Sequence, residues 1–206
     1  KNNIKISKNF MSNKIAIVGA GGHGKVVGEI ALLNNYEIID FFDDRANEIK
    51  SFPFTVVDTF DNLKENLNNY NAFFVAIGDN KIRYDKICLL KKYKINIVSL
   101  VHPKATISKF SSLGVGSCVM SNAVVNPGTL IKEGVIINTS ASVDHDCIIE
   151  DFTHISPNCS ISGSVRIGKF THLGSGTSIH PGIHIGNNVK TGVGSKIFKD
   201  ILDYTI

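Results

Sequence analysis

The 206-residue sequence predicts two successive folds, a small parallel α/β domain and a β-solenoid built from six-residue repeats. Two observations carry this prediction. Short apolar runs alternate with helical patterns from residue 15 to about residue 100, and an aliphatic residue then recurs at every sixth position from residue 107. The two halves therefore follow different periods and belong to different domains.

The first half has the alternation that is typical of βαβ units. Its apolar runs predict buried strands, and its amphipathic patterns predict helices. We expect strands over 15–18, 37–42, 72–78 and 95–101, and helices over 25–33 and 80–93. Buried strands separated by helices form a parallel sheet. The prediction is a Rossmann-like domain over residues 14–105.

The second half can be written in hexads without an insertion, from ISKFSS through LGVGSC to IFKDIL. Every first position except Thr191 is Ile, Leu or Val, and the fifth position is usually small. Three hexads can close one coil with the aliphatic side chains stacked inside it. We expect this solenoid over residues 106–206. Its flat sides favour association with further copies.

Composition excludes several classes of protein. The formal net charge is +4, but residues 1–14 hold four lysines and no acid, so the remainder is balanced, which argues against nucleic-acid binding. Met11 directly precedes the first strand, and residues 1–13 are expected to be a flexible or vector-derived extension. No apolar run approaches the roughly 20 residues that span a membrane. Four cysteines without a CxxC pair favour a reduced, cytoplasmic setting.

The stretch GAGGHGK joins the first strand to the first helix, and Gly19, Gly21 and Gly24 fit the pattern G-x-G-x-x-G. Such a turn lets backbone N–H groups approach an anion. Three interpretations stay open: a nucleotide-sugar diphosphate site, a dinucleotide site and a purely structural turn. The small domain favours the first. His23 either contacts the ligand or bonds a backbone carbonyl.

His145 lies between Asp144 and Asp146. It is either a general base with an orienting carboxylate or a solvated turn residue. Asp144 is expected to be a solvated corner residue.

His154 and His172 are one coil apart and should stack at about 4.8 Å. A metal site would need a third ligand, so no metal is expected. Cys147 and Cys159 occupy fifth positions and are expected to be core thiols.

Several segments together resemble a known family. They are GAGGHGKVV (19–27), FFDD (41–44), AIGDNKIR (76–83) and GVIINTSASVDHDCIIEDFTHIS (134–156), followed by the hexads. Over about residues 14–201 the chain is similar to the sialic-acid O-acetyltransferase family of hexapeptide-repeat sugar acetyltransferases. This resemblance implies a left-handed parallel β-helix, a homotrimer and acetyl-CoA held between subunits.

The resemblance also implies roles for particular residues. His145 matches the family's general base, and Asp146 matches its acidic neighbour. The expected nucleotide-sugar contacts are Gly21, Gly22, His23, Gly24, Asp43, Asp44, Ala76, Ile77, Gly78 and Asn138. The expected acetyl-CoA contacts are His154, Gly163, Gly174, Ser175, Gly192 and Val193.

The function implied is acetyl-CoA-dependent N-acetylation of a nucleotide-activated deoxy-amino sugar for surface glycan or glycoprotein synthesis. The expected acceptor is of the UDP-4-amino-4,6-dideoxy-N-acetylglucosamine type, and the neutral imidazole of His145 would take the amine proton. O-acetylation of sialic acid or a related sugar is the alternative within the family. A nicotinamide-dependent oxidoreductase and a non-catalytic scaffold are the alternatives outside it. No nucleic acid or membrane is expected as a partner.

Overall fold

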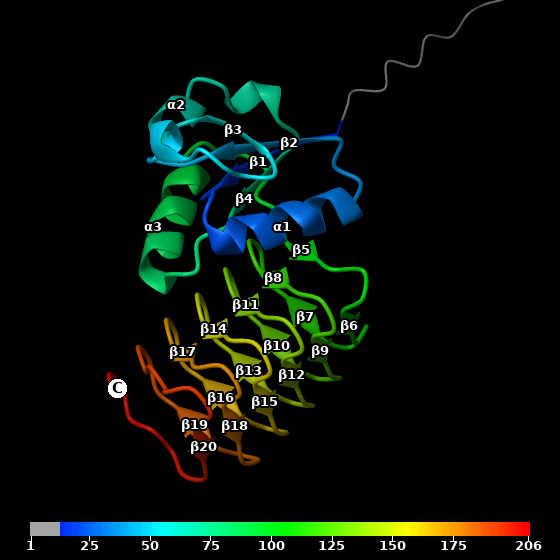
Figure 1. Ribbon diagram of the computed structural model, residues 1–206. Coiled ribbons are helices and arrows are strands. Elements are labelled where there is room, and N and C mark those ends of the chain that lie inside the picture. Colours follow the sequence, from blue (N-terminus) through cyan, green and yellow to red (C-terminus); the bar gives the residue numbers. More distant parts are fainter. Residues whose placement is uncertain (1–12) are drawn as a thin grey trace, which may run out of the picture.

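The computed structural model describes residues 13–206, which fold as an α/β domain placed on one end of a β-solenoid (Figure 1). The predicted N-terminal extension lies outside the described residues, apart from Asn13. The elements of the α/β domain are β1 (Lys14–Val18), α1 (Gly22–Leu33), β2 (Ile38–Phe42), the 3₁₀ turn η1 (Ala46–Glu48), β3 (Thr55–Asp58), α2 (Phe60–Leu63), the 3₁₀ turn η2 (Leu67–Asn69), β4 (Ala72–Val75) and α3 (Asn80–Lys91).

The sheet of this domain is parallel and has the order β3-β2-β1-β4. Alternate residues of β1 serve two cores: Ile15 and Ile17 pack with α1, and Ala16 and Val18 pack with α2 and α3. None of the helices within residues 13–206 is long and apolar enough to cross a bilayer. The Rossmann-like prediction is confirmed.

The structure differs from the sequence expectation at two points. β3, a half-exposed edge strand, was not expected. The run expected as one strand over 95–101 is split, because Ile97 bridges Phe73 at the edge of the α/β sheet, whereas Leu100 and Val101 pair with the solenoid strand at Cys118–Val119. The solenoid ladder therefore starts before the boundary placed at residue 106, since this short segment serves both sheets.

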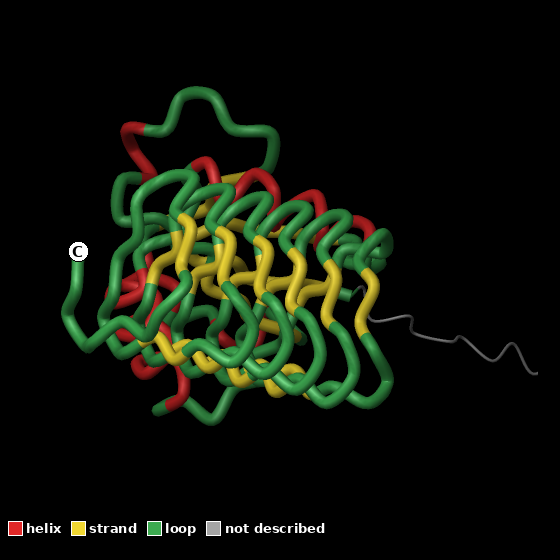
Figure 2. The backbone as a smooth tube through the Cα atoms, turned by 90° about the horizontal axis from the view of Figure 1, so that it is seen from below, coloured by secondary structure: helices red, strands yellow, loops and turns green. Residues whose placement is uncertain are grey.

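The solenoid has three faces of stacked two-residue strands (Figure 2). Face 1 holds β5 (Leu100–Val101), β8 (Cys118–Val119), β11 (Ile136–Ile137), β14 (His154–Ile155) and β17 (His172–Leu173). Face 2 holds β6 (Thr106–Ile107), β9 (Val124–Val125), β12 (Ser142–Val143), β15 (Ser160–Ile161), β18 (Ser178–Ile179) and β20 (Lys196–Ile197). Face 3 holds β7 (Ser112–Leu113), β10 (Leu130–Ile131), β13 (Ile148–Ile149), β16 (Arg166–Ile167) and β19 (His184–Ile185).

The hexad pattern predicts the interior of the solenoid correctly. The first and fifth hexad positions supply its core, which runs from Val119 to Ile197. Thr191, the exception among the first positions, uses its hydroxyl inside the coil: Oγ1 accepts a hydrogen bond from the Gly174 amide at 2.9 Å and pairs with the Thr177 hydroxyl at 3.0 Å. A polar side chain is tolerated there because it is satisfied.

Each coil turns at corner residues with positive φ, and these corners give the solenoid three edges. The docking corner contains Gly116, Gly134, Phe152, Phe170 and Asn188; the dyad corner contains Gly128, Asp146, Ser164 and Gly182; the third corner contains Asn122, Ser140, Asn158, Gly176 and Gly194. Face 1 lies between the docking corner and the third corner. The dyad corner is therefore the edge opposite face 1.

The α/β domain docks on face 1 and on the docking corner. Beneath α1, the outward column of face 1 is apolar and buried at Leu100, Cys118 and Ile136. One coil further on, the same column becomes polar, at His154 and then His172. The docking corner meets α3, where Tyr84 packs edge-on against the rings of Phe152 and Phe170, at centroid distances of 5.1 and 5.4 Å.

The corner geometry makes Gly134 a sharp test of this docking. A Cβ at Gly134 would lie within 2.5 Å of the Phe152 ring at a φ of +63°, whereas at Gly182 the φ is +74° and nothing lies within 4 Å. Both alanine substitutions should cost about 1 kcal/mol for the left-handed conformation. Gly134→Ala should cost more and lower the Tm further, because Phe152 must move. Equal Tm losses in a thermal melt would contradict this account.

Candidate functional site

The crevice beside the glycine loop lies where β1 and β4 end and α1 begins. It has a volume of about 410 Å³, and its lining includes Gly21, Gly22, His23 and Gly78. Gly21 is the N-cap of α1 but makes no side-chain cap, so the first amide groups of this helix face the crevice without an intrahelical acceptor. In α3, by contrast, the Asp79 carboxylate accepts the amides of Lys81 and Ile82. The uncapped helix is the one suited to an anion.

The glycines of this loop divide into two groups. Gly19 has a φ of +104°, and a Cβ there would lie 2.8 Å from the Ala76 carbonyl oxygen; at Gly24 a Cβ would lie 2.3 Å from the Gly19 oxygen. These two glycines are explained by the tight turn alone. At Gly21 and Gly22 a Cβ would meet nothing within 4 Å. Their open space is where a ligand could approach the backbone.

The acidic pair after β2 has two different roles. Asp43 Oδ2 accepts the Ala20 amide at 2.8 Å, and its Oδ1 accepts the Arg45 amide at 2.9 Å. Burial raises the pKa of Asp43, whereas these hydrogen bonds lower it, and the net effect is a lowered pKa. Asp43 therefore shapes the glycine turn. Asp44 is exposed and pairs with Lys86, whose ammonium also lies over the Phe60 ring at 4.0 Å.

A group of histidines lies where the α/β domain meets face 1. Burial first, and then Arg83, lower the pKa of His23 to about 4, and its Nε2 is buried without a hydrogen-bond partner among the described residues. Of the two interpretations of His23, a hydrogen bond to a backbone carbonyl is thus not made by Nε2. Burial, and then His172, lower the pKa of His154 to about 3. Both rings are neutral at physiological pH.

Asn138 fixes the tautomer of His154. Asn138 Oδ1 accepts the Thr139 amide at 2.8 Å, and Nδ2 lies 3.1 Å from His154 Nε2. Since Nδ2 can only donate, Nε2 is the acceptor and Nδ1 carries the proton. The nearby backbone of Gly78 raises the pKa of His154 slightly against the effect of burial. No acceptor among the described residues lies in hydrogen-bond geometry with Nδ1. The Nδ1–H group of His154 is therefore a buried donor beside the backbone of Gly78.

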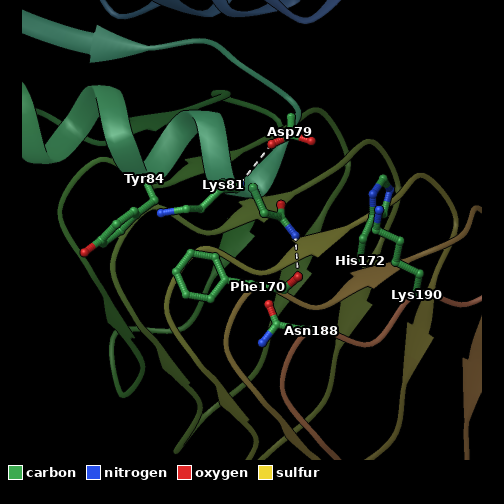
Figure 3. Close-up of a pocket in the computed structure, with 8 residues that line it drawn as sticks. Asp79, Lys81, Tyr84, Phe170, His172, Asn188 and Lys190 are labelled. Atoms are coloured by element: carbon green, nitrogen blue, oxygen red, sulfur yellow. Dashed lines mark hydrogen bonds between the residues drawn. The ribbon is translucent and has the colours of Figure 1, made fainter. Parts of the chain in front are cut away.

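The predicted histidine stack is confirmed: the His154 and His172 rings lie 4.5 Å apart with an interplanar angle of 15°. His172 Nε2 pairs with the Ser156 hydroxyl at 3.0 Å. A cavity of about 480 Å³ has His172 and Lys190 on one side and the start of α3, with Lys81 and Tyr84, on the other (Figure 3). Within the described residues, no group of three His, Cys, Asp or Glu side chains is arranged to hold a metal.

The catalytic candidate lies on the dyad corner. His145 Nδ1 and Asp146 Oδ2 are 2.8 Å apart, and the two side chains are 57% and 67% exposed. Asp146 reaches the ring directly because its φ is +59°. The hydrogen bond from Asp146 first, and then the charge of Asp144, raise the pKa of His145. With Nδ1–H donated to the carboxylate, Nε2 is left as the basic nitrogen.

Two neighbours fix this histidine. Asp144, expected to be a solvated corner residue, also accepts two hydrogen bonds at Oδ1, from the Asn126 side-chain amide at 2.9 Å and from the His145 amide at 2.8 Å. A carboxylate at this position satisfies two donors and stiffens the turn. A Cβ at Gly163 would lie 2.6 Å from His145 Nε2 and Cε1. Glycine therefore makes room for the imidazole ring.

The structure separates the predicted site residues into groups within one chain. Gly163 lies with His145 on the dyad corner. Gly174 with Ser175, and Gly192 with Val193, flank the third corner. His154 lies on face 1 beside the glycine-loop crevice, on the side opposite the dyad corner. Within one chain, His145 is not among the residues that line the crevice.

Sequence reasoning assigned no role to Arg83 and Asn80, the buried polar residues of α3. Both lie in the AIGDNKIR segment that carries part of the family resemblance. The signal available in the sequence was an arginine on the helix face that also carries Ile87 and Leu90.

The comparisons agree with this geometry. The profile of the family described as "PglD N-terminal domain" matches residues 14–88. The acetyltransferase domain of PglB from Neisseria gonorrhoeae FA1090 is 40% identical, with a TM-score of 0.88, covering 93% of this chain and 94% of that one. The chain belongs to the PglB/PglD-type acetyltransferase family.

Two further proteins similar to this chain have informative names. PerB from Caulobacter crescentus in complex with CoA and GDP-perosamine is 31% identical, with a TM-score of 0.85, covering 93% of this chain and 91% of that one. A UDP-N-acetylbacillosamine N-acetyltransferase of Bacillus subtilis (strain 168) is 33% identical over 114 residues, which span 52% of this chain and about half, 51%, of that relative. The name of the Bacillus subtilis relative specifies N-acetylation, which is the reaction that the sequence predicts.

The dyad makes a prediction that needs no substrate. Asp146→Asn should lower the pKa of His145, because the largest cause of its raised pKa is the hydrogen bond to this carboxylate. The neutral imidazole should therefore appear at lower pH in the variant. An NMR titration of the histidine Cε1–H resonances measures this, and the His172 resonance serves as the internal control. An unchanged His145 titration would show that the Asp146 contact is absent in solution.

Proposed function

We propose that this chain transfers the acetyl group of acetyl-CoA to the amino group of a nucleotide-linked deoxy-amino sugar. The observation that carries the proposal is the presence of an uncapped glycine crevice and an oriented His–Asp dyad on one chain that matches acetyltransferases over nearly its whole length. The name of the Bacillus subtilis relative and the ligands of the Caulobacter crescentus complex support the acceptor class.

The reaction follows from the dyad. The acceptor amine attacks the thioester carbonyl, a C–N bond forms, and His145 Nε2 takes the proton that the nitrogen must lose. The carboxylate of Asp146 stabilises the resulting imidazolium. The C–S bond then breaks, and the CoA thiolate takes the proton from His145. An acyl-enzyme is not needed, and burial raises the pKa of the Cys147 and Cys159 thiols, which leaves them poor nucleophiles.

In this proposal the crevice binds the nucleotide diphosphate. The amides at the start of α1 take the negative charge, with Lys86 at the rim, and His23 lines the same crevice with its Nε2 unpaired. Backbone amides at Gly163, Gly174 and Gly192 are the proposed donor contacts. Because both substrates are cytoplasmic metabolites, the proposal places the enzyme in the cytoplasm.

The proposal includes a homotrimer with its sites between copies. Within one chain the crevice and His145 lie on opposite sides of the solenoid, so the base must come from a neighbouring copy. Flat β-solenoid sides can pack next to one another, and closed cyclic symmetry would give every copy one complete site.

Activity is tested with acetyl-CoA and two acceptors, UDP-4-amino-4,6-dideoxy-N-acetylglucosamine and GDP-perosamine, by following CoA release. We expect turnover with one of them and a loss of at least about 10²-fold in His145→Ala. Sialic acid as the acceptor tests the O-acetylation alternative. Binding of NAD by a protein that shows no CoA release would favour the oxidoreductase alternative. Turnover that is unaffected in His145→Ala would make this histidine a turn residue only.

The shared site predicts complementation between two inactive variants. Gly21→Glu introduces a carboxylate into the crevice where its φ of −89° accepts any side chain and nothing lies within 4 Å. Co-expressed with His145→Ala under separate tags, it should recover about one quarter of wild-type activity, because a random mixture pairs one intact crevice with one intact base at that frequency. No recovery in the doubly tagged species would place both groups in one chain.

A further inference from the structure

Arg83 of α3 is completely buried between the two domains. Its guanidinium donates to four backbone carbonyls. Nη1 donates to Ile77 O at 2.9 Å and to Gly78 O at 3.0 Å, Nε donates to Gly134 O at 2.7 Å, and Nη2 donates to Phe152 O at 3.0 Å. The first two carbonyls belong to the rim of the crevice. The last two belong to successive turns of the docking corner.

Asn80 extends this contact by one coil. Its Oδ1 accepts from Arg83 Nη2 at 2.8 Å, and its Nδ2 donates to Phe170 O at 2.8 Å and to Thr171 O at 3.1 Å. Asn80 is the first residue of α3 and follows the N-cap Asp79. The pair therefore spans three stacked turns of the docking corner. The corner residues of these turns share the same left-handed conformation, and each turn offers a backbone carbonyl to Arg83 or Asn80.

Among residues 13–206, no carboxylate forms an ion pair with Arg83. Burial lowers the pKa of Arg83 to about 9, so the group stays protonated at neutral pH, and Asp79 is the acid that acts on it from a distance. A buried charge balanced by carbonyl dipoles contributes less stability than a well-packed apolar side chain. Its planar fork, however, fixes orientation, because each N–H direction must find its own acceptor.

We propose that Arg83 is a positioning residue that sets the placement of the nucleotide-sugar crevice on the β-helix. This inference rests on the proposed function, because the position of the crevice on the β-helix matters only when the acceptor amine must meet a base supplied by a neighbouring copy. The guanidinium joins the Ile77–Gly78 rim to the turns at Gly134 and Phe152. His154, two residues beyond Phe152, is held in the same alignment under Gly78.

The test compares Arg83→Lys with Tyr84→Leu, a neighbour on the same helix that packs on the same corner without touching the four carbonyls. A lysine keeps the charge but cannot hold both domains. Arg83→Lys should lower kcat on the order of 10²-fold, as expected for a small misplacement of the reacting groups. The KM for acetyl-CoA and the affinity for the free nucleoside diphosphate should change by less than about twofold. Tyr84→Leu should lower the Tm and keep kcat within about twofold.

Addition of guanidinium ion to Arg83→Ala gives a rescue arm, since the free ion can refill the cavity and restore part of kcat. Where the Arg83 variants fail to fold, Asn80→Ala replaces them and should show the same kcat loss at smaller amplitude. The positioning role is overturned by an unchanged kcat in Arg83→Lys, or by kcat losses that follow the Tm losses equally in the Arg83 and Tyr84 variants.

Hydrogen exchange separates this inference from the proposed function. In Arg83→Lys, the peptides covering residues 76–79 and 133–136 should exchange faster, whereas the dyad corner at 144–147 should not change. Wild type that releases no CoA with any acceptor disproves the proposed function but leaves this measurement intact. Unchanged exchange in the first two peptides disproves the positioning role whatever the activity.

Discussion

The buried guanidinium of Arg83 is the interaction on which the arrangement of the two domains depends. Two apolar clusters contain residues of both domains, and the hydrophobic effect that holds the domains together is not directional. The guanidinium requires four carbonyls in defined directions, two from the crevice rim and two from the solenoid. Leaving such a charge unpaired inside a protein costs about 3–5 kcal/mol, so alternative alignments are strongly disfavoured.

The solenoid can present these acceptors because its corners repeat. A left-handed residue costs roughly 1–2 kcal/mol when it carries a side chain. The chain accepts this at Phe152 and Phe170, whose rings stack at 5.6 Å and form the platform for Tyr84. At Gly134 the platform itself requires glycine, because a side chain would enter the Phe152 ring. The residues that carry the backbone strain of the corner are thus the residues on which the α/β domain docks.

The same geometry divides the chemistry between two places. Charge is handled at the crevice, where the start of α1 is left uncapped and the nearby histidines are kept neutral by burial. In the proposed mechanism, proton transfer takes place at the exposed dyad corner, where Asp146 raises the pKa of His145. Neither place is complete alone. This division accounts for the proposed assembly, because a second copy can bring a dyad corner to a crevice.

The sequence by itself determined the strand and helix alternation, the solenoid interior and the glycine turn, because each of these is a local period or a local backbone requirement. Its aliphatic hexads predicted the core, and the spacing of His154 and His172 predicted their stack. Tertiary structure alone decided that residues 95–101 serve two sheets, that Asp144 is a turn acceptor, and that Arg83 bonds four carbonyls. Those features depend on which distant backbone groups come within hydrogen-bond reach. The separation of His145 from the crevice was likewise invisible in sequence, because it is a property of the triangular cross-section and not of any motif.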